Sequence, residues 1–375
     1  MAAVTDLLAD IRALVECESP SADVAAVARC AEVVARVGTA HLRAEPERIV
    51  LDGRTHLRWR LGATPSRVLL LGHHDTVWPL GSLADHPCTV EGGVLRGPGC
   101  FDMKAGLVMA FHAAAGLDGV TLLVTGDEEL GSPSSRGLIE EEARTVGAAL
   151  VLEASAAGGA LKTERKGTSM YEVRVIGRAA HAGLEPERGV NATIELAHQV
   201  LAVDALADRQ AGTTVTATAA SAGTTGNTVP AAGFLAVDVR ARTVAEQDRV
   251  DRAIRALRPV LPGARVEVTG NPNRPPLEPA ASAALFERVR RIAARLGLPE
   301  PTRAAVGGAS DGNFTAGVGT PTLDGLGAVG GGAHAPDEHV LIDDLPGRTA
   351  LLRALVEDLL AESTNPVARS GRAQP

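Results

Sequence analysis

Histidine and acidic side chains follow several apolar runs in this chain, and these residue types bind divalent cations. The run SRVLLLGHHDTV ends in His73, His74 and Asp75. Further candidates follow along the chain, at Asp102, Glu128, Glu129, Glu153 and His334. Two imidazoles and three carboxylates could hold two divalent cations that share one carboxylate, with the charges close to balance. Imidazole and carboxylate ligands without thiolate favour zinc, with cobalt or manganese as alternatives.

The apolar runs before these residues predict short buried strands. They are RVLLLGHHDTV, GVTLLVTGDEELGS and GAALVLEAS, and an Ala-rich helical pattern follows Asp102 between the first two. Strand, helix and strand in succession predict a mainly parallel sheet with helices on its faces. Ligands bind beyond the carboxyl ends of the strands in such sheets. The sequence therefore places the candidate ligands at one edge of a sheet.

From about Thr168 the pattern changes to that of a separate unit. Alternating runs, SMYEVRVIG, TTVTATAAS, GFLAVDVRART and ARVEVTG, are joined in part by the helical runs NATIELAHQVLAVDALA and AEQDRVDRAIRALRPVL. The order β-α-β-β-α-β is typical of an α+β, ferredoxin-like unit. We therefore predict an α/β protein with a discontinuous first domain at residues 1–167 and 273–363. An inserted domain at 168–272 and a disordered polar tail at 364–375 complete the prediction.

Each of these features also has a plain structural interpretation. A single acidic residue at a strand end often caps a helix, and a single histidine is more often structural than metal-binding. GDEELGS could be an exposed acidic turn, and GGGAHAPDEH could be a flexible loop. Only the joint occurrence of these residues, in this order and at strand ends, favours a metal site.

Composition excludes several other classes of protein. The net charge of −8, with acids and bases interspersed, argues against a nucleic-acid surface. The four cysteines form no CxxC pair, which argues against a thiolate zinc site and a disulfide framework. The first 20 residues predict an amphipathic helix rather than a secretion signal, and no apolar run reaches the ~18 residues of a membrane span. We expect a soluble, cytoplasmic protein with no nucleic-acid or membrane partner.

Seven segments together resemble a known family. They are GHHDTVWPLG, GPGCFDMKAG, VTGDEELGS, VLEAS, GRAAHAG, TTGNTVPA and GGGAHAPDEHV. They resemble the di-zinc metallopeptidases that include glutamate carboxypeptidase, aminoacylase, acetylornithine deacetylase and succinyl-diaminopimelate desuccinylase. The resemblance runs from about residue 5 to residue 362, and DTVWPLG is most similar to the glutamate carboxypeptidase branch.

This resemblance implies a function and an assembly. The function would be a zinc-dependent amidohydrolase or carboxypeptidase with two Zn²⁺ per chain. It would release an amino acid with a free carboxylate from an N-acyl amino acid or short peptide. The inserted domain would serve as a lid and dimerisation domain of a homodimer.

The resemblance also assigns the first motif. The family has H-x-D here, so His73 would bind zinc, Asp75 would orient it, and His74 would occupy the variable position. A strand agrees with this spacing, because residues two apart point the same way. His74 remains the alternative ligand. Asp102 resembles the bridging carboxylate, which the family often follows with a cis peptide, here Asp102–Met103.

The other matched residues complete the implied site. Glu129 and His334 resemble the remaining ligands of one zinc, His73 and Glu153 those of the other, and Glu128 the general base. If the chain is extended at this point, Glu128 cannot reach the metal that Glu129 binds and is free to act on water.

Three matches fall at the inserted domain or beside it. His181 resembles the transition-state histidine, Asn227 a substrate-binding asparagine, and Arg274 the arginine that binds a substrate carboxylate. Arg274 could also be a solvated linker residue. GGASDGNF, residues 307–314, resembles a substrate-side glycine loop, although Ser310 and Asp311 could equally be turn residues. His181 lies outside the metal-binding domain, so some part of the inserted domain must reach the metal site. In dimeric relatives the inserted domain reaches the partner's site, so the resemblance implies composite sites that use His181 of the opposite chain. Short alternating strands such as SMYEVRVIG could offer the pairing edge.

One departure from the family affects the predicted substrate. The glutamate carboxypeptidase branch has a substrate-binding lysine after the second glutamate ligand. Lys162 and Lys166 are the candidates here, and neither aligns without a gap. The alternative functions are a dipeptidase or aminopeptidase of the same fold, and a non-catalytic binding protein, which should have lost ligands or the base.

Overall fold

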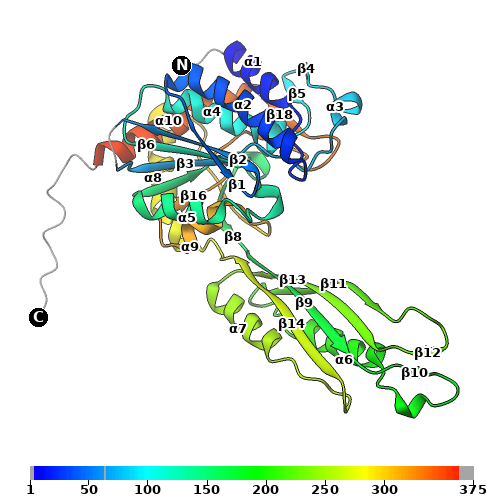
Figure 1. Cartoon of the computed structure of the whole chain (residues 1–375). Helices are drawn as coiled ribbons and strands as arrows, with labels where there is room; N and C mark the ends of the chain where they lie inside the picture. The colour runs from blue at the N-terminus through cyan, green and yellow to red at the C-terminus, as the bar shows by residue number, and fades with distance from the viewer. Residues whose placement is uncertain (1–3, 63–64, 363–375) are drawn as a thin grey trace, which may run out of the picture. The chain divides into compact units, whose positions relative to one another are not determined.

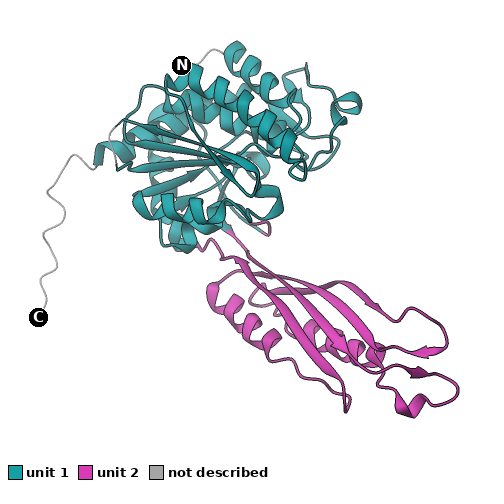
Figure 2. Ribbon diagram, viewed as in Figure 1, with its two compact units in different colours: residues 1–164, 279–306, 310–375 teal, residues 165–278, 307–309 magenta. Residues whose placement is uncertain are grey.

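The structure is a computed structural model that describes residues 4–62 and 65–362. The chain divides into two compact units, each considered by itself (Figure 2). Unit 1 comprises Met1–Glu164, Pro279–Val306 and Ser310–Pro375, and unit 2 comprises Arg165–Glu278 and Gly307–Ala309. The predicted insert, 168–272, falls inside unit 2. The predicted disordered tail, 364–375, lies outside the described residues.

Unit 1 is built on a six-stranded, mainly parallel sheet, as predicted (Figure 1). The strands in sheet order are β1 (Glu47–Leu51), β2 (Arg54–Leu61), β6 (Val120–Thr125), β3 (Val68–His73), β7 (Ala148–Val151) and β16 (Thr322–Leu323). β6, β3, β7 and β16 run parallel, whereas β1 and β2 form an antiparallel hairpin at one edge. The carboxyl ends of the four parallel strands therefore meet at one edge of the sheet.

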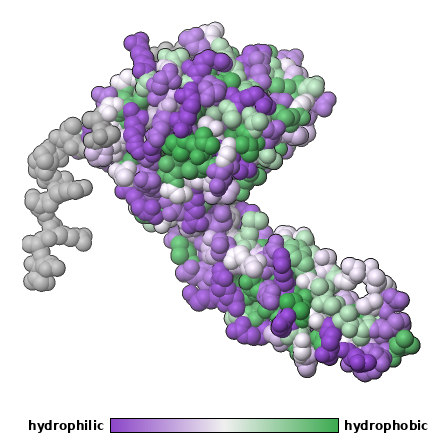
Figure 3. Space-filling model, viewed as in Figure 1, coloured by the Kyte–Doolittle hydropathy of each residue, from purple (hydrophilic) through white to green (hydrophobic). Residues whose placement is uncertain are grey.

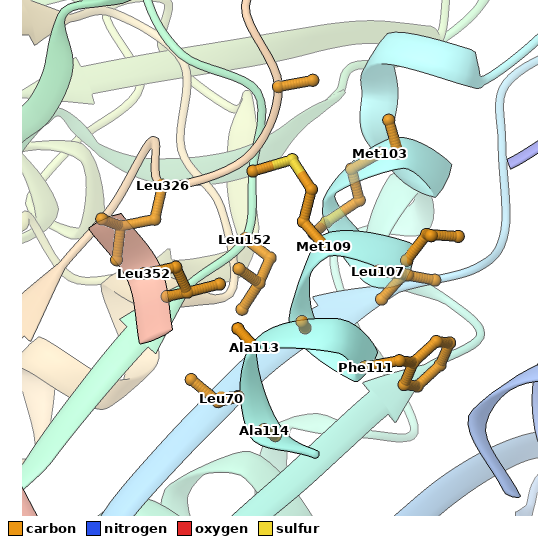
Figure 4. Packing of buried hydrophobic residues seen from close by; sticks show 14 of the residues in the cluster. Leu70, Met103, Leu107, Met109, Phe111, Ala113, Ala114, Leu152, Leu326 and Leu352 are labelled. Carbon is orange, nitrogen blue, oxygen red and sulfur yellow. The ribbon is translucent and has the colours of Figure 1, made fainter. Parts of the chain in front are cut away.

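Helices pack on both faces of this sheet because the central strands are apolar on both sides. Leu70 of β3 belongs to the larger core and lies near Ala113 and Ala114 in Figure 4, whereas Leu69 and Leu71 belong to the core on the opposite face. The larger core contains α1 (Val4–Val15), α2 (Val24–Leu42), α4 (Ala105–Ala114), α8 (Pro279–Leu296) and α10 (Leu345–Glu362). The opposite core contains α5 (Arg136–Thr145) and α9 (Gly312–Gly317).

Smaller elements of unit 1 bring distant segments together. A four-stranded sheet has the order β17 (Gly330–Gly331), β18 (His339–Leu341), β5 (Val94–Arg96) and β4 (Thr89–Glu91). It places the segment after β17 beside the turn that precedes α4. The remaining elements are α3 (Ser82–Asp85) and the pair β8 (Leu161–Arg165) and β15 (Arg303–Val306).

Unit 2 has the predicted β-α-β-β-α-β order. Its antiparallel sheet runs β11 (Thr214–Ala222), β13 (Ala232–Ala241), β9 (Gly167–Ile176) and β14 (Arg265–Arg274). α6 (Ala192–Asp204) and α7 (Val244–Arg255) cover one face, where Tyr171, Val173 and Val175 of β9 are buried as the alternation predicts. The prediction that SMYEVRVIG forms an edge is wrong, because β14 returns along β9 and makes it an inner strand.

The described residues contain no helix long and apolar enough to cross a membrane. On the face seen in Figure 3, hydrophilic residues cover much of each unit, with smaller hydrophobic patches between them.

Candidate metal centre

The five side chains predicted as metal ligands converge beyond the carboxyl ends of the parallel strands of unit 1. His73 is the last residue of β3, and Glu153 follows β7. Glu129 lies in a 3₁₀ turn, η2 (Glu128–Leu130), after β6. Asp102 lies in the kinked segment η1 (Cys100–Lys104) before α4, where its own backbone is not helical, and His334 follows β17.

Asp102 lies between the two histidines. Its Oδ1 is 3.4 Å from His73 Nε2, and its Oδ2 is 3.3 Å from His334 Nε2. Glu153 Oε1 is 3.6 Å from His73 Nε2, and Glu129 Oε1 is 3.2 Å from His334 Nε2. Each histidine thus faces one carboxylate of its own and one oxygen of Asp102, an arrangement that can hold two ions with Asp102 between them.

The structure brings His73, and not His74, into this cluster. His73 Nδ1 lies 3.0 Å from the backbone oxygen of Asp75, so the ring donates its Nδ1 proton there and presents Nε2 to the cluster. His74 Nε2 lies 3.0 Å from the carbonyl oxygen of Thr55 on β2. Neighbouring residues of a strand point in opposite directions, so His73 faces the cluster and His74 points away from it.

Asp75 joins the end of β3 to the turn that carries the glutamates. It is fully buried and accepts hydrogen bonds from the backbone N–H groups of Glu128 and Glu129, both at 3.2 Å. Ser21 Oγ donates to the same carboxylate at 2.6 Å. Asp75 therefore positions both His73 and the glutamate pair.

Glu128 and Glu129 belong to different ligand groups, as predicted. The reason differs from the prediction, because the chain is not extended here. They lie in a 3₁₀ turn, where successive side chains point about 120° apart. A carboxylate oxygen of Glu128 groups with His73 and Glu153, with ligand atoms within 4.8 Å of one another, whereas Glu129 groups with His73 and Asp102.

The buried atoms of the cluster fit divalent cations. His73 Nε2 and Asp102 Oδ1 are buried, and neither has a hydrogen-bond partner among the described residues. Such atoms are costly to bury unless an ion or another group satisfies them. Zinc ligation by imidazole and carboxylate would satisfy both of these atoms.

The electrostatics of the cluster agree with a cation site. Contacts with Asp102 and Glu129 raise the pKa of His334 to about 10, although burial opposes the shift. Burial alone would raise the pKa of Asp102, but His334 and His73 together hold it well below its ordinary value. The carboxylates thus create a negative potential that attracts positive charge.

The peptide bond between Asp102 and Met103 is cis, as the resemblance implies. His334 has a φ of 62°, in the left-handed region that non-glycine residues rarely adopt. Left-handed conformations of non-glycine residues, such as that of His334, cluster at functional sites.

Glu338 supports the site and was not predicted. Its carboxylate is buried and accepts hydrogen bonds from the backbone N–H groups of Gly99, Phe101 and Asp102 at 2.9–3.0 Å, and from Trp78 Nε1 at 2.7 Å. It joins the segment that carries His334 to the turn that carries Asp102. A single acidic residue four positions after His334 gives no local signal of these contacts, which span more than 200 residues.

Asp311 has a supporting position as well. It is buried and accepts hydrogen bonds from Thr125 at 3.0 Å and from Ser132, on either side of the 3₁₀ turn. Ser310 is buried and donates to Asp324 at 2.6 Å. These buried contacts favour the interpretation of Ser310 and Asp311 as turn residues over their interpretation as part of a substrate-side loop.

Unit 2 brings two of the remaining predicted residues together and separates the third. His181 lies on β10 (Ala180–His181), which pairs with β12 (Thr228–Val229), and the N–H of Ala182 donates to the carbonyl of Asn227 at 2.9 Å. Arg274 pairs with Thr168 at the opposite end of the sheet, roughly 25 Å away along β9. Arg274 is buried, so the alternative of a solvated linker arginine is wrong.

Comparisons with known proteins define the class. Residues 69–358 match peptidase family M20/M25/M40. The chain is 33% identical over 301 residues to Carboxypeptidase G2 of Pseudomonas sp. (strain RS-16), covering 76% of this chain and 72% of that protein. The chain therefore belongs to peptidase family M20/M25/M40 and is a metallopeptidase-family hydrolase, which confirms the resemblance.

Solved structures agree on the fold. The aminopeptidase PepT of Bacillus cereus superposes with a TM-score of 0.75 at 22% identity, covering 96% of this chain and 99% of that one. YXEP of Bacillus subtilis, a dinuclear metal binding peptidase of the M20 family, superposes with a TM-score of 0.64 at 15% identity, covering 96% and 99%.

Proposed function

We propose that this protein is a zinc-dependent amidohydrolase or carboxypeptidase that binds two Zn²⁺ per chain. It would release an amino acid with a free carboxylate from an N-acyl amino acid or short peptide. The observation that carries the proposal is the position of Asp102, with one oxygen toward His73 and the other toward His334. The similarity to Carboxypeptidase G2 and the dinuclear metal of YXEP support it.

The residues divide into ligands and a base. Divalent ions held in the cluster would polarise the amide carbonyl and lower the pKa of water. Glu128 accepts the proton of the attacking water and delivers it to the amide nitrogen as the carbon–nitrogen bond breaks, so that a neutral amine leaves. His73 and Glu153 would hold one ion and Glu129 and His334 the other, with Asp102 shared.

His181 is suited to donate a hydrogen bond to the tetrahedral oxyanion. Its Nδ1 accepts hydrogen bonds from the backbone N–H groups of Gly183 and Leu184, each at 3.1 Å. The neutral ring therefore carries its proton on Nε2. The side chain is exposed, so this N–H can reach a developing negative oxygen. Asn227 beside it would bind the substrate.

Positive side chains favour a substrate with a free carboxylate. Arg240 and Arg274 both pair with Thr168, on opposite sides of β9. Burial lowers the pKa of Lys166, and the nearby charges of Arg242 and Arg240 add to the shift. A planar arginine binds a carboxylate through two hydrogen bonds, so we assign this role to Arg274.

A hydrolysis screen with added Zn²⁺ or Co²⁺ tests the function. It compares N-acyl amino acids with dipeptides that are blocked at one end or the other. We expect substrates with a blocked carboxyl end to resist hydrolysis and those with a blocked amino end to be cleaved. The reverse would favour the alternative, a dipeptidase or aminopeptidase of this fold. A metal-loaded protein with no hydrolytic activity would favour a binding protein.

Unit 2 also offers a surface for a homodimer, on β11 rather than β9. β11 is a nine-residue edge strand without a charged residue, TVTATAASA, and most of it is exposed. α6 packs beside it and exposes Ile194 and Leu201, which are 49% and 69% exposed. Edge strands are normally protected by charge, proline or pairing. We therefore propose that β11 and α6 pair with the same elements of a second chain.

We propose that His181 acts in the site of the partner chain. His181 lies at one end of the unit 2 sheet, and the chain enters and leaves unit 2 at the other end, near residues 165 and 278. Mixing His181→Ala and Glu128→Gln proteins, each nearly inactive alone, should restore activity, because a heterodimer then has one intact site. Activity is measured after subunit exchange, which differently labelled chains verify. No recovery despite exchange would show that His181 acts within its own chain.

A further inference from the structure

A second cluster of metal-binding side chains lies among three helices of unit 1. It consists of Asp10 on α1, His41 on α2 and His112 on α4. His41 Nε2 lies 2.7 Å from Asp10 Oδ2, and His112 Nε2 lies 3.1 Å from the same oxygen. The two ring centres are 3.9 Å apart. One nitrogen of each ring is therefore directed at a single carboxylate oxygen.

These distances are close to those of a metal site. Zinc binds histidine nitrogen at about 2.0–2.1 Å and carboxylate oxygen at about 2.0–2.2 Å in tetrahedral sites, which sets neighbouring ligand atoms about 3.3 Å apart. The three candidate ligand atoms all lie within 4.8 Å of one another. Small side-chain movements would thus admit an ion, and water could complete its coordination.

We propose that Asp10, His41 and His112 form a third metal site, which takes a zinc-like transition-metal ion. Two imidazoles and one carboxylate favour zinc, copper or nickel over magnesium and calcium, which prefer oxygen ligands. The site is distinct from the centre around Asp102, since His112 lies about two turns into α4.

Access and position suit such a site. The side chains of Asp10 and His41 are 23% and 25% exposed, so an ion can enter from solvent, whereas His112 is 8% exposed and anchors the buried side. The three ligands come from three helices of one core, and each lies on a different helix. An ion bound here would cross-link α1, α2 and α4 and stabilise the folded state.

Metal counting on the full-length protein tests the proposal. The protein is equilibrated with Zn²⁺, desalted and analysed for zinc per chain. Asp10→Asn and His112→Gln should each bind one zinc fewer than the unchanged protein. His86→Gln, which removes a histidine elsewhere in unit 1, should bind as many as the unchanged protein. An anomalous difference map at the zinc edge should place an ion between His41 Nε2 and His112 Nε2.

Differences in zinc content decide the outcome, so the result does not depend on how many ions the centre around Asp102 holds. Two variants at different ligands guard against misfolding, and thermal unfolding in chelator verifies that each is folded. Equal zinc content in the unchanged protein and both folded variants would overturn the third site. An equal loss in His86→Gln would also overturn it, because the zinc would then be bound by surface histidines in general.

Discussion

Glu128→Gln should leave a folded, metal-loaded protein whose kcat is lower by the ~10²–10⁴-fold typical of lost acid–base catalysis, or more. The amide keeps the size of the glutamate but cannot accept the proton of water. Glu128 is 7% exposed, and its carboxylate groups with His73 and Glu153, which places it beside the proposed ions. Steady-state kinetics together with zinc analysis of the same sample measure both parts of the prediction.

Two matched variants make this prediction specific. Glu129→Gln should lose zinc, because Glu129 Oε1 faces His334 Nε2 at 3.2 Å. Glu140→Gln, on α5, should change neither activity nor zinc content, because Glu140 pairs with the surface arginines Arg136 and Arg144 of its own helix. If Glu128→Gln loses zinc while Glu129→Gln retains it, the roles of the two glutamates are reversed.

The edge of the sheet that carries the candidate site was predictable because local patterns determine it. Apolar runs predict β3, β6 and β7, and a helical pattern between strands predicts that they run parallel. Parallel strands bring their carboxyl ends to one edge, so His73, Glu129 and Glu153 are expected to meet there. The alternation in β9 likewise predicts which of its residues are buried.

Long-range pairing determines what the sequence could not predict. Three backbone N–H groups and the Trp78 side chain can donate hydrogen bonds to Glu338 because β18 pairs with β5. β9 is an inner strand because β14 returns beside it after a helix. His74 turns away from the centre toward a carbonyl of β2 that is distant in sequence. Neither hydrophobic periodicity nor residue spacing contains these contacts.

Hydrophobic periodicity also could not predict the local backbone conformation of Glu128 and Glu129. Three polar residues, Asp127 to Glu129, follow β6, and they suit an extended loop as well as a turn. The buried carboxylate of Asp127 accepts hydrogen bonds from Ser134 at 2.7 Å and from Ser135 at 3.2 Å, and these bonds close the segment after η2. The separate directions of Glu128 and Glu129 therefore depend on tertiary contacts.

Asp102→Ala should be the most damaging change of a single ligand, with loss of both zinc ions and of hydrolytic activity. Within the proposed ligand set, Asp102 is the carboxylate that lies at ion-pair distance from both histidines, through Oδ1 at 3.4 Å from His73 and Oδ2 at 3.3 Å from His334. Its removal also takes a negative charge from a centre that must balance two divalent cations. Zinc content and kcat of the variant, measured beside the unchanged protein, give the result.

Glu153→Ala is the matched comparison, because it removes a ligand of one ion, whereas Asp102→Ala removes the ligand proposed to be shared by both. Of the two histidines of the centre, Glu153 pairs with His73, at 3.6 Å, so its loss should release chiefly one of the two ions. Asp118→Ala, in an exposed turn before β6, should retain both ions and full activity. Removing one ligand commonly weakens metal binding without unfolding the chain, so thermal unfolding in chelator serves as the control for folding. If Asp102→Ala and Glu153→Ala retain equal zinc, then Asp102 does not bridge the two ions, and the proposed assignment of ligands would have to be abandoned.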